Sequence, residues 1–168
     1  MAVDKDEVIR AAVQLERDGR KMYLDMAEKA SNDMARRMFE SLADDETLHI
    51  QWIENLEPGA KNAGEANRKT YQRLRHIFAD VSANEKEKAA QAKKDLEAID
   101  LALDMEEKSR AAYAEWAEDS ENEEVRRLCT VLADVERFHR EVLENSKEYF
   151  QKPGDWFMQE ERWMFDGG

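Results

Sequence analysis

Apolar residues recur every three or four positions along four long segments of this chain, which is the spacing of the buried face of an amphipathic α-helix. The pattern predicts long helices over residues 5–30, 33–56, 94–119 and 121–150. Turn and capping residues separate these segments, with Ser31-Asn32-Asp33 before the second helix and Pro58-Gly59 after it. We therefore predict an all-α protein whose four long helices form a bundle.

The second pair of long helices repeats the first pair in sequence. Glu46-Thr47-Leu48-His49 recurs ninety residues later as Glu136-Arg137-Phe138-His139, and the match extends without insertion or deletion. The same offset relates further identical residues: Glu7 and Glu97, Ile9 and Ile99, Ala12 and Ala102, Glu16 and Glu106, Tyr23 and Tyr113, Ala27 and Ala117, Asn32 and Asn122. The bundle is thus predicted to be a duplicated helical hairpin.

Residues 57–93, which join the two copies, differ in composition from the rest of the chain. They are polar and rich in lysine, asparagine and alanine, apart from one apolar group at Tyr71, Leu74, Ile77 and Phe78. We predict a long crossover that contains a short helix near residues 67–80. A connection of this length allows the second and third long helices to run parallel. His76 has no glutamate three residues before it, so we interpret it as a surface or packing residue.

The composition limits the class of protein. Among 168 residues, 39 are acidic and 26 are basic, and the formal charge of −13 argues against binding to nucleic acid or to an anionic membrane. The single cysteine, Cys129, excludes a disulfide framework and a four-cysteine metal site, and we expect it to be a buried thiol. The first residues lack a secretory pattern, and no apolar run reaches membrane-spanning length. We therefore expect one domain that acts in the cytoplasm.

Each Glu-x-x-His pair places a carboxylate and an imidazole on one helix face, about one turn apart, where both can bind one metal ion. Glu16 and Glu106 occupy matching places on the first and third long helices. Glu7 and Glu97 also match, but they precede those residues by nine positions, which is about half a turn out of phase. Glu107 is displaced by one position. The candidate metal ligands are therefore Glu16, Glu46, His49, Glu106, Glu136 and His139.

This set has one carboxylate from each of four helices and one imidazole from each of two, as in di-iron and di-manganese carboxylate bundles. Four glutamates buried together would repel one another and would lose their hydration. Two divalent cations supply positive charge that balances the four carboxylates. The competing interpretation is a metal-free structural bundle, in which the glutamates are solvated and the histidines are satisfied core residues.

The order and spacing of these residues resemble the ferritin-like di-iron domain of rubrerythrins. The resemblance covers about residues 5–150 and rests on Glu16 with Tyr23, Glu46-x-x-His49, Glu106 with Tyr113, and Glu136-x-x-His139. It implies a ferritin-like four-helix bundle at residues 1–150 that holds two iron ions, with manganese or zinc as substitutes. It also implies that Glu46 and Glu136 bridge the irons, that Glu16 and Glu106 are terminal ligands, and that His49 and His139 bind one iron each.

Two features depart from a complete rubrerythrin. The cysteines of a rubredoxin domain are absent, so electrons are expected from an external donor such as a rubredoxin or a reductase. Position 109 is a serine, Ser109, where rubrerythrins carry an additional glutamate that can bind iron. The resemblance therefore does not imply rubrerythrin-type iron movement or efficient reduction of peroxide.

The function expected from the resemblance is a di-iron oxidoreductase of the response to oxidative stress, which reacts a di-ferrous site with H₂O₂ or O₂. The alternative is a ferroxidase or iron-binding protein that stores or delivers iron without sustained turnover. Tyr23 and Tyr113 are candidates to hydrogen-bond the terminal glutamates or to quench oxidising equivalents, or else they are core aromatics. Trp52 is expected in the core, and Asp45 is a conceivable partner for the second nitrogen of an imidazole.

The C-terminal segment, residues 151–168, is dense in large apolar side chains such as Trp156, Phe157, Trp163 and Phe165. In water these side chains would form a large exposed apolar patch. We therefore expect the segment to dock on its own bundle or on a second subunit, and we predict a homodimer.

Overall fold

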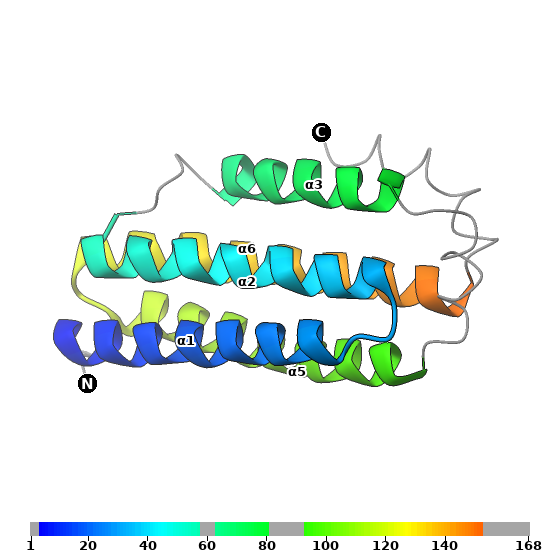
Figure 1. The fold of residues 1–168 in the computed structure, drawn as a ribbon. Coiled ribbons are helices and arrows are strands. Elements are labelled where there is room, and N and C mark those ends of the chain that lie inside the picture. The colour runs from blue at the N-terminus through cyan, green and yellow to red at the C-terminus, as the bar shows by residue number, and fades with distance from the viewer. Residues whose placement is uncertain (1–3, 58–62, 81–92, 153–168) are drawn as a thin grey trace.

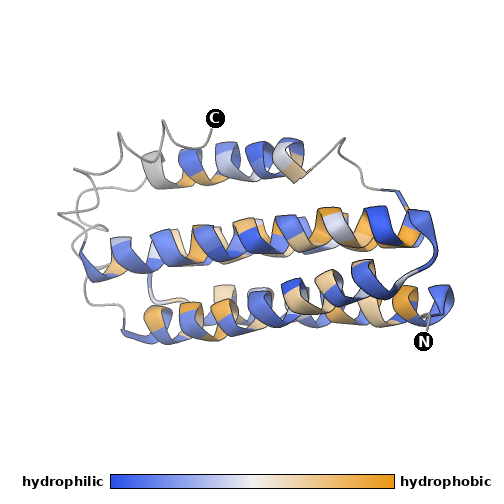
Figure 2. Cartoon of the chain, turned by 180° about the vertical axis from the view of Figure 1, so that it is seen from behind, coloured by the Kyte–Doolittle hydropathy of each residue, from blue (hydrophilic) through white to orange (hydrophobic). Residues whose placement is uncertain are grey.

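The computed structural model describes residues 4–57, 63–80 and 93–152 of the chain. Within these ranges the protein is all-α, and its five helices are α1 (Lys5–Lys29), α2 (Asp33–Asn55), α3 (Ala63–Asp80), α5 (Lys93–Asp119) and α6 (Glu123–Gln151). Along the helices, hydrophobic residues recur between hydrophilic ones (Figure 2). The four predicted long helices are present, and each end lies within about two residues of its predicted position. The prediction of an all-α protein with four long helices is therefore confirmed.

The four long helices pair as two hairpins. α1 packs along α2, and α5 packs along α6, so each sequence repeat is one antiparallel pair (Figure 1). α3 packs against α2 and α6 and carries the chain back along the length of the bundle. As a result α2 and α5 run in the same direction, which the length of the crossover had allowed. α3 is longer than predicted, because it begins at Ala63 rather than near residue 67.

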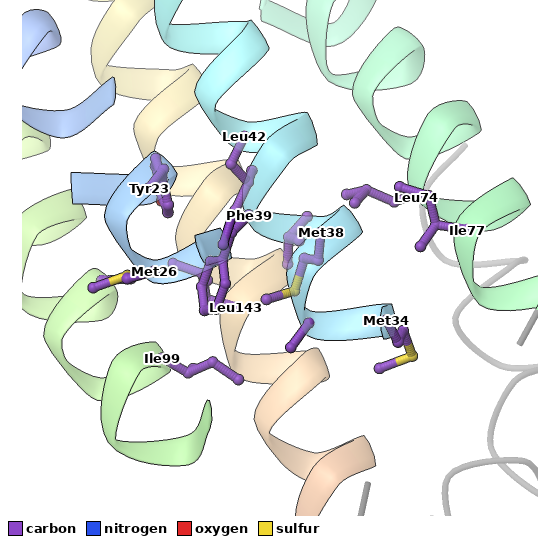
Figure 3. Packing of buried hydrophobic residues seen from close by; sticks show 14 of the residues in the cluster. Tyr23, Met26, Met34, Met38, Phe39, Leu42, Leu74, Ile77, Ile99 and Leu143 are labelled. Atoms are coloured by element: carbon purple, nitrogen blue, oxygen red, sulfur yellow. The ribbon is translucent and has the colours of Figure 1, made fainter. Parts of the chain in front are cut away.

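The apolar core is divided into two clusters. One lies toward the end of the bundle that holds the α1–α2 turn, and it includes Leu74 and Ile77 of α3 (Figure 3). The other lies toward the opposite end and includes Val8, Ile53 and Leu132. Along each long helix, the candidate ligands fall between the residues of these two clusters. The ligand positions therefore form a polar layer that is enclosed between two apolar layers.

A side chain from the second repeat holds the turn between α1 and α2. Asn32 caps α2, because its side chain accepts a hydrogen bond from the backbone N–H of Ala35 at 2.8 Å. Asp95, near the start of α5, is buried and accepts three hydrogen bonds from the same turn. The donors are the backbone N–H of Ser31 at 2.8 Å, its hydroxyl at 2.5 Å and the side-chain amide of Asn32 at 2.9 Å. Asp95 thus joins the two hairpins at this end of the bundle.

Two expectations concern the surroundings of the bundle. No helix in the described ranges is long and apolar enough to cross a membrane. The predicted docking of the aromatic segment falls on residues 153–168, which lie outside the described residues. That docking, and the homodimer inferred from it, stay predictions.

Replacing Asp95 with alanine should lower the free energy of unfolding by about 2–3 kcal/mol, because hydrogen bonds to a buried carboxylate are lost together. Urea denaturation followed by circular dichroism measures this change. Asp100→Ala is a matched control on the same helix, since Asp100 is exposed and pairs with Lys147. It should cost less than about 1 kcal/mol. Equal losses in the two variants would contradict the role given to Asp95.

Candidate metal centre

The structure brings all six candidate ligands together in the polar layer of the bundle. Their carboxylate and imidazole atoms form two groups, and the ligand atoms of each group lie within 4.8 Å of one another. All six side chains are at most 3% exposed. The first group is Glu16, Glu46, His49 and Glu136, and the second is Glu46, Glu106, Glu136 and His139.

The carboxylates that the helical phase excluded lie outside these groups. Glu7 and Glu97 are exposed. Glu107 is half-buried and accepts hydrogen bonds from Arg110 at 2.6 Å and from Arg140 at 2.7 Å. The position of a glutamate on its helix was therefore enough to separate these residues from the cluster.

Glu46 and Glu136 belong to both groups, and each directs one carboxylate oxygen toward each histidine. Nδ1 of His49 lies 3.4 Å from Oε2 of Glu46 and 3.4 Å from Oε1 of Glu136. Nδ1 of His139 lies 3.6 Å from Oε1 of Glu46 and 3.3 Å from Oε2 of Glu136. The imidazole rings are stacked, with their centroids 5.4 Å apart. This arrangement suits two carboxylates that bridge a pair of metal positions.

Glu16 and Glu106 each belong to one group only. Oε2 of Glu16 lies 3.1 Å from Nδ1 of His49, and Oε1 of Glu106 lies 3.4 Å from Nδ1 of His139. The two groups are therefore equivalent in composition: each has one glutamate and one histidine of its own, and both share the same two glutamates.

Gly19 allows α1 to approach this layer closely. A Cβ atom at Gly19 would lie 3.3 Å from Sδ of Met105 on α5 and 3.7 Å from the carboxyl carbon of Glu46. The contact with Glu46 would be an ordinary van der Waals distance, whereas the Met105 side chain would have to shift by a few tenths of an ångström. The glycine thus leaves room for Met105 between α1 and α5.

The four glutamates differ in the direction in which their pKa values are shifted. Burial and the charges of Glu46 and Glu136 raise the pKa of Glu16 well above its usual value. Burial and Glu136 raise the pKa of Glu106 in the same way. Burial also opposes ionisation of the two shared glutamates, but their neighbours outweigh it. The pKa of Glu46 is lowered, and that of Glu136 lies well below its usual value, because Glu16, Glu106 and the imidazoles stabilise the anions.

The histidines complete the balance of charge. Burial alone would lower the pKa of His49 and of His139, but the surrounding carboxylates raise both well above the ordinary value. Without metal, the raised pKa values favour the protonated forms of both histidines and of Glu16 and Glu106, and the lowered pKa values favour ionised Glu46 and Glu136. Divalent cations would replace these protons as the positive charge beside the carboxylates, so metal binding should release protons.

The unpaired atoms of the cluster fit a pair of metal ions. Buried polar atoms are normally hydrogen-bonded, because an unpaired one loses its hydration without compensation. Within the described residues, the atoms of this cluster without a hydrogen-bond partner are Oε1 of Glu46, Oε2 of Glu106, Oε1 of Glu136, and both ring nitrogens of His139. Carboxylate oxygens and imidazole nitrogens are ligands for divalent iron, manganese and zinc. The donor set is therefore that of a di-metal carboxylate site.

Tyr23 and Tyr113 connect the two repeats across the cluster. The hydroxyl of Tyr23 on α1 donates a hydrogen bond to Glu106 on α5, and the hydroxyl of Tyr113 on α5 donates one to Glu16 on α1. Burial and the adjacent glutamate raise the pKa of each tyrosine well above its usual value, so both stay protonated donors. The hydrogen bonds that the sequence suggested are present, and each crosses to the opposite repeat.

Asp45 connects α3 to the cluster. Its Oδ2 atom lies 3.6 Å from Nε2 of His139 and accepts a hydrogen bond from the hydroxyl of Thr70 at 2.8 Å. Its Oδ1 atom accepts a hydrogen bond from the guanidinium of Arg73. Burial opposes ionisation of Asp45, but His139 and Arg73 outweigh it and hold its pKa below the usual value. Thr70 and Arg73 were missed, because the crossover has no second copy against which its polar residues could be aligned.

Three further residues near the cluster have distinct surroundings. Trp52 is half-buried rather than in the core, and its ring packs on His49 with centroids 5.2 Å apart. Ser109 is buried and offers a hydroxyl instead of a carboxylate. Cys129 is buried as expected, and burial raises the pKa of its thiol to about 12. A thiol with this pKa stays protonated and is a poor nucleophile.

The metal-free protein should lose thermal stability as the pH rises above 6.5. His49 and His139 have folded-state pKa values above the ordinary 6.5, so their stabilising contribution is complete below that pH and is lost as the pH rises through the folded-state values. The raised pKa values of Glu16 and Glu106 act in the same direction above pH 4.5. Melting temperatures of the metal-free protein across this range measure the effect.

Two variants serve as controls for the pH dependence. The double variant His49→Gln/His139→Gln should show a flatter profile, because two of the proton-binding groups are gone. His76→Gln should behave as the wild type, since His76 is exposed on α3. A melting temperature that stays constant or rises with pH contradicts the protonation states assigned to the cluster.

Comparison with known proteins agrees with this geometry. A family model described as Rubrerythrin matches residues 7–147, a range that includes all six candidate ligands. The chain matches no curated protein and no solved structure. The family match covers most of the chain, and the resemblance seen in the sequence is confirmed. The chain belongs to the rubrerythrin family.

Proposed function

We propose that the protein is a di-iron oxidoreductase that reduces H₂O₂ or O₂ with electrons from an external donor. The observation that carries the proposal is the pair of shared glutamates, Glu46 and Glu136, each of which faces both histidines inside a buried layer. Membership of the rubrerythrin family supports it. When bound, a pair of iron ions supplies the electrons that reduce the oxidant and takes electrons back from the donor.

The six side chains have separate parts in this proposal. Glu46 and Glu136, which belong to both groups, would hold both ions, and Glu16 with His49 would complete the ligands of one ion. Glu106 with His139 would complete those of the other. The apolar clusters on both sides exclude water, which strengthens the attraction between carboxylates and cations. The protein thus presents a rigid, dry set of ligands whose own charges the ions neutralise.

Tyr23 and Tyr113 orient the two terminal glutamates by hydrogen bonding to one carboxylate oxygen each. In Glu16 the other oxygen, Oε2, contacts His49, whereas in Glu106 the bonded oxygen, Oε1, is also the one that lies 3.4 Å from His139. Because their pKa values are raised, the tyrosines hold their protons beside the site. We propose that they also serve as local sources of protons or electrons that quench oxidising equivalents.

The donor of electrons lies outside this chain in the proposal. A rubredoxin-type iron site needs several cysteine ligands, whereas the chain has one cysteine, which is buried. A separate rubredoxin or a reductase is therefore the proposed partner.

The alternative function is ferroxidase-linked iron storage or delivery without sustained turnover. Ser109 favours this alternative, because a buried hydroxyl replaces the additional glutamate expected from the resemblance. The same metal centre serves both functions, so only the fate of the oxidised site distinguishes them.

Glu46→Ala should abolish binding of both ions, because Glu46 contributes to both groups, whereas Glu16→Ala should spare the group that contains His139. Anaerobic reconstitution with Fe²⁺ followed by metal analysis counts the ions per chain. Glu107→Ala is the matched control and should bind two ions, since Glu107 pairs with arginines instead. Two ions in Glu46→Ala would contradict a bridging role, and none in the wild type would contradict the metal centre.

An oxidoreductase should complete repeated cycles of oxidation and reduction. The di-ferrous protein is mixed with H₂O₂ or with O₂ in a stopped-flow spectrometer, together with a reduced rubredoxin as electron donor. Multiple turnovers with one of the two oxidants are expected, and the more rapid reaction identifies the physiological one. A single oxidation that the donor does not reverse supports iron storage or delivery and contradicts the proposed oxidoreductase.

A further inference from the structure

The two repeats differ at a position that faces the histidines. Asp45 on α2 corresponds, at the repeat offset of ninety residues, to Val135 on α6. Both side chains are buried. The ligands of the two metal positions are otherwise identical in type. This substitution therefore breaks the symmetry of the centre immediately outside the ligands.

Asp45 faces the outer side of one histidine. His139 directs Nδ1 toward the shared glutamates, which leaves Nε2 on the outer side of the ring, 3.6 Å from Oδ2 of Asp45. This separation is longer than a hydrogen bond. A buried carboxylate at this distance still attracts an N–H dipole strongly, because little water screens the interaction. Asp45 therefore favours the tautomer of His139 that carries its proton on Nε2 and keeps the lone pair of Nδ1 directed at the cluster.

The residue on α6 that corresponds to Asp45 is apolar. Val135 has no polar side-chain atom, and the ring of Trp52 packs on His49. A cavity of about 120 Å³ lies beside His49, and its lining combines Leu48, Trp52 and Val135 with the polar side chains of Asp45, Lys69, Thr70 and Arg73. Valine at this position can neither orient the imidazole nor raise its basicity, so the two histidines differ as ligands.

The crossover helix fixes the position of Asp45. Thr70 donates a hydrogen bond to Oδ2 at 2.8 Å, and the guanidinium of Arg73 donates one to Oδ1. Arg73 is itself held by Ser41 of α2, whose hydroxyl accepts a hydrogen bond from Nε at 3.2 Å. α3 lies between the two repeats, and among the described helices it has no second copy. The insertion between the hairpins thus fixes the carboxylate that faces Nε2 of His139.

We propose that Asp45, anchored by Thr70 and Arg73, is a positioning residue that makes the His139 side of the centre the tighter of two unequal metal positions. This inference rests on the di-metal centre of the proposed function. Carboxylate partners of metal-binding histidines typically contribute about 10- to 100-fold in metal affinity. The two ions should therefore bind in separate steps, with the position beside His139 filled first.

The test uses the full-length metal-free protein and Zn²⁺ alone as the probe. Competition with a chelator gives the two dissociation constants, which should differ at least about tenfold in the wild type. The chain has three histidines, so ¹⁵N-histidine NMR spectra resolve each ring. The first equivalent of Zn²⁺ should shift the signals of His139, and the second should shift those of His49.

Asp45→Asn should weaken the tighter step by about 10- to 100-fold and leave the weaker step unchanged within about threefold. The first equivalent should then no longer select His139. Asp44→Asn is the matched control, since Asp44 is the exposed neighbour on the same helix, and it should match the wild type. Thr70→Val leaves Asp45 in place but removes one of its anchors. It should weaken the same step by a smaller factor, and its result decides the question if Asp45→Asn does not fold.

The outcomes separate this inference from the proposed function. Two bound ions in the wild type, with affinities and NMR order unchanged in Asp45→Asn and Thr70→Val, overturn the role of Asp45 and leave the metal centre standing. A wild-type protein that does not bind two ions overturns the metal centre itself and the inference with it. Weakening of the tighter step alone, in Asp45→Asn and by a smaller factor in Thr70→Val but not in Asp44→Asn, supports the proposal.

Discussion

Neutralisation of buried negative charge is the constraint on which the rest of this structure depends. Four glutamates lie in one layer inside the bundle, and water does not reach them to stabilise their charges. In the metal-free state bound protons serve this purpose, since the pKa values of both histidines and of Glu16 and Glu106 are raised. Divalent cations held by the same side chains would serve it in place of the protons.

The two apolar clusters strengthen the electrostatic interactions within the polar layer. They close the polar layer from both ends of the bundle and keep its effective dielectric low. The close approach at Gly19 and the crossed hydrogen bonds of Tyr23 and Tyr113 hold α1 and α5 against each other beside the layer. Each tyrosine anchors a glutamate of the other repeat, so a ligand cannot move without affecting the opposite hairpin. Rigidity of this kind keeps the ligand atoms close together despite their repulsion.

The duplicated hairpin explains the near symmetry of the centre, and the crossover helix explains its departure from symmetry. Each repeat contributes one glutamate from its first helix and one Glu-x-x-His pair from its second. α3 belongs to neither repeat, and it packs against α2 and α6, the two helices that carry the histidines. Two of its polar residues, Thr70 and Arg73, hydrogen-bond Asp45, whose carboxylate faces His139. The segment that connects the two hairpins is therefore also part of the surroundings of the metal site.

The sequence by itself determined the four long helices, the duplication and the six residues of the cluster. These features depend on the helical period and on identity at a fixed offset, which are local and need no coordinates: nine residues place Glu7 on the opposite face from Glu16, and three place His49 beside Glu46. Only the tertiary structure decided which tyrosine meets which glutamate, that α3 begins at Ala63, and that Thr70 and Arg73 hold Asp45. Those contacts depend on how helices are rotated and shifted against one another. That arrangement follows from the packing of the whole core, and no single segment encodes it.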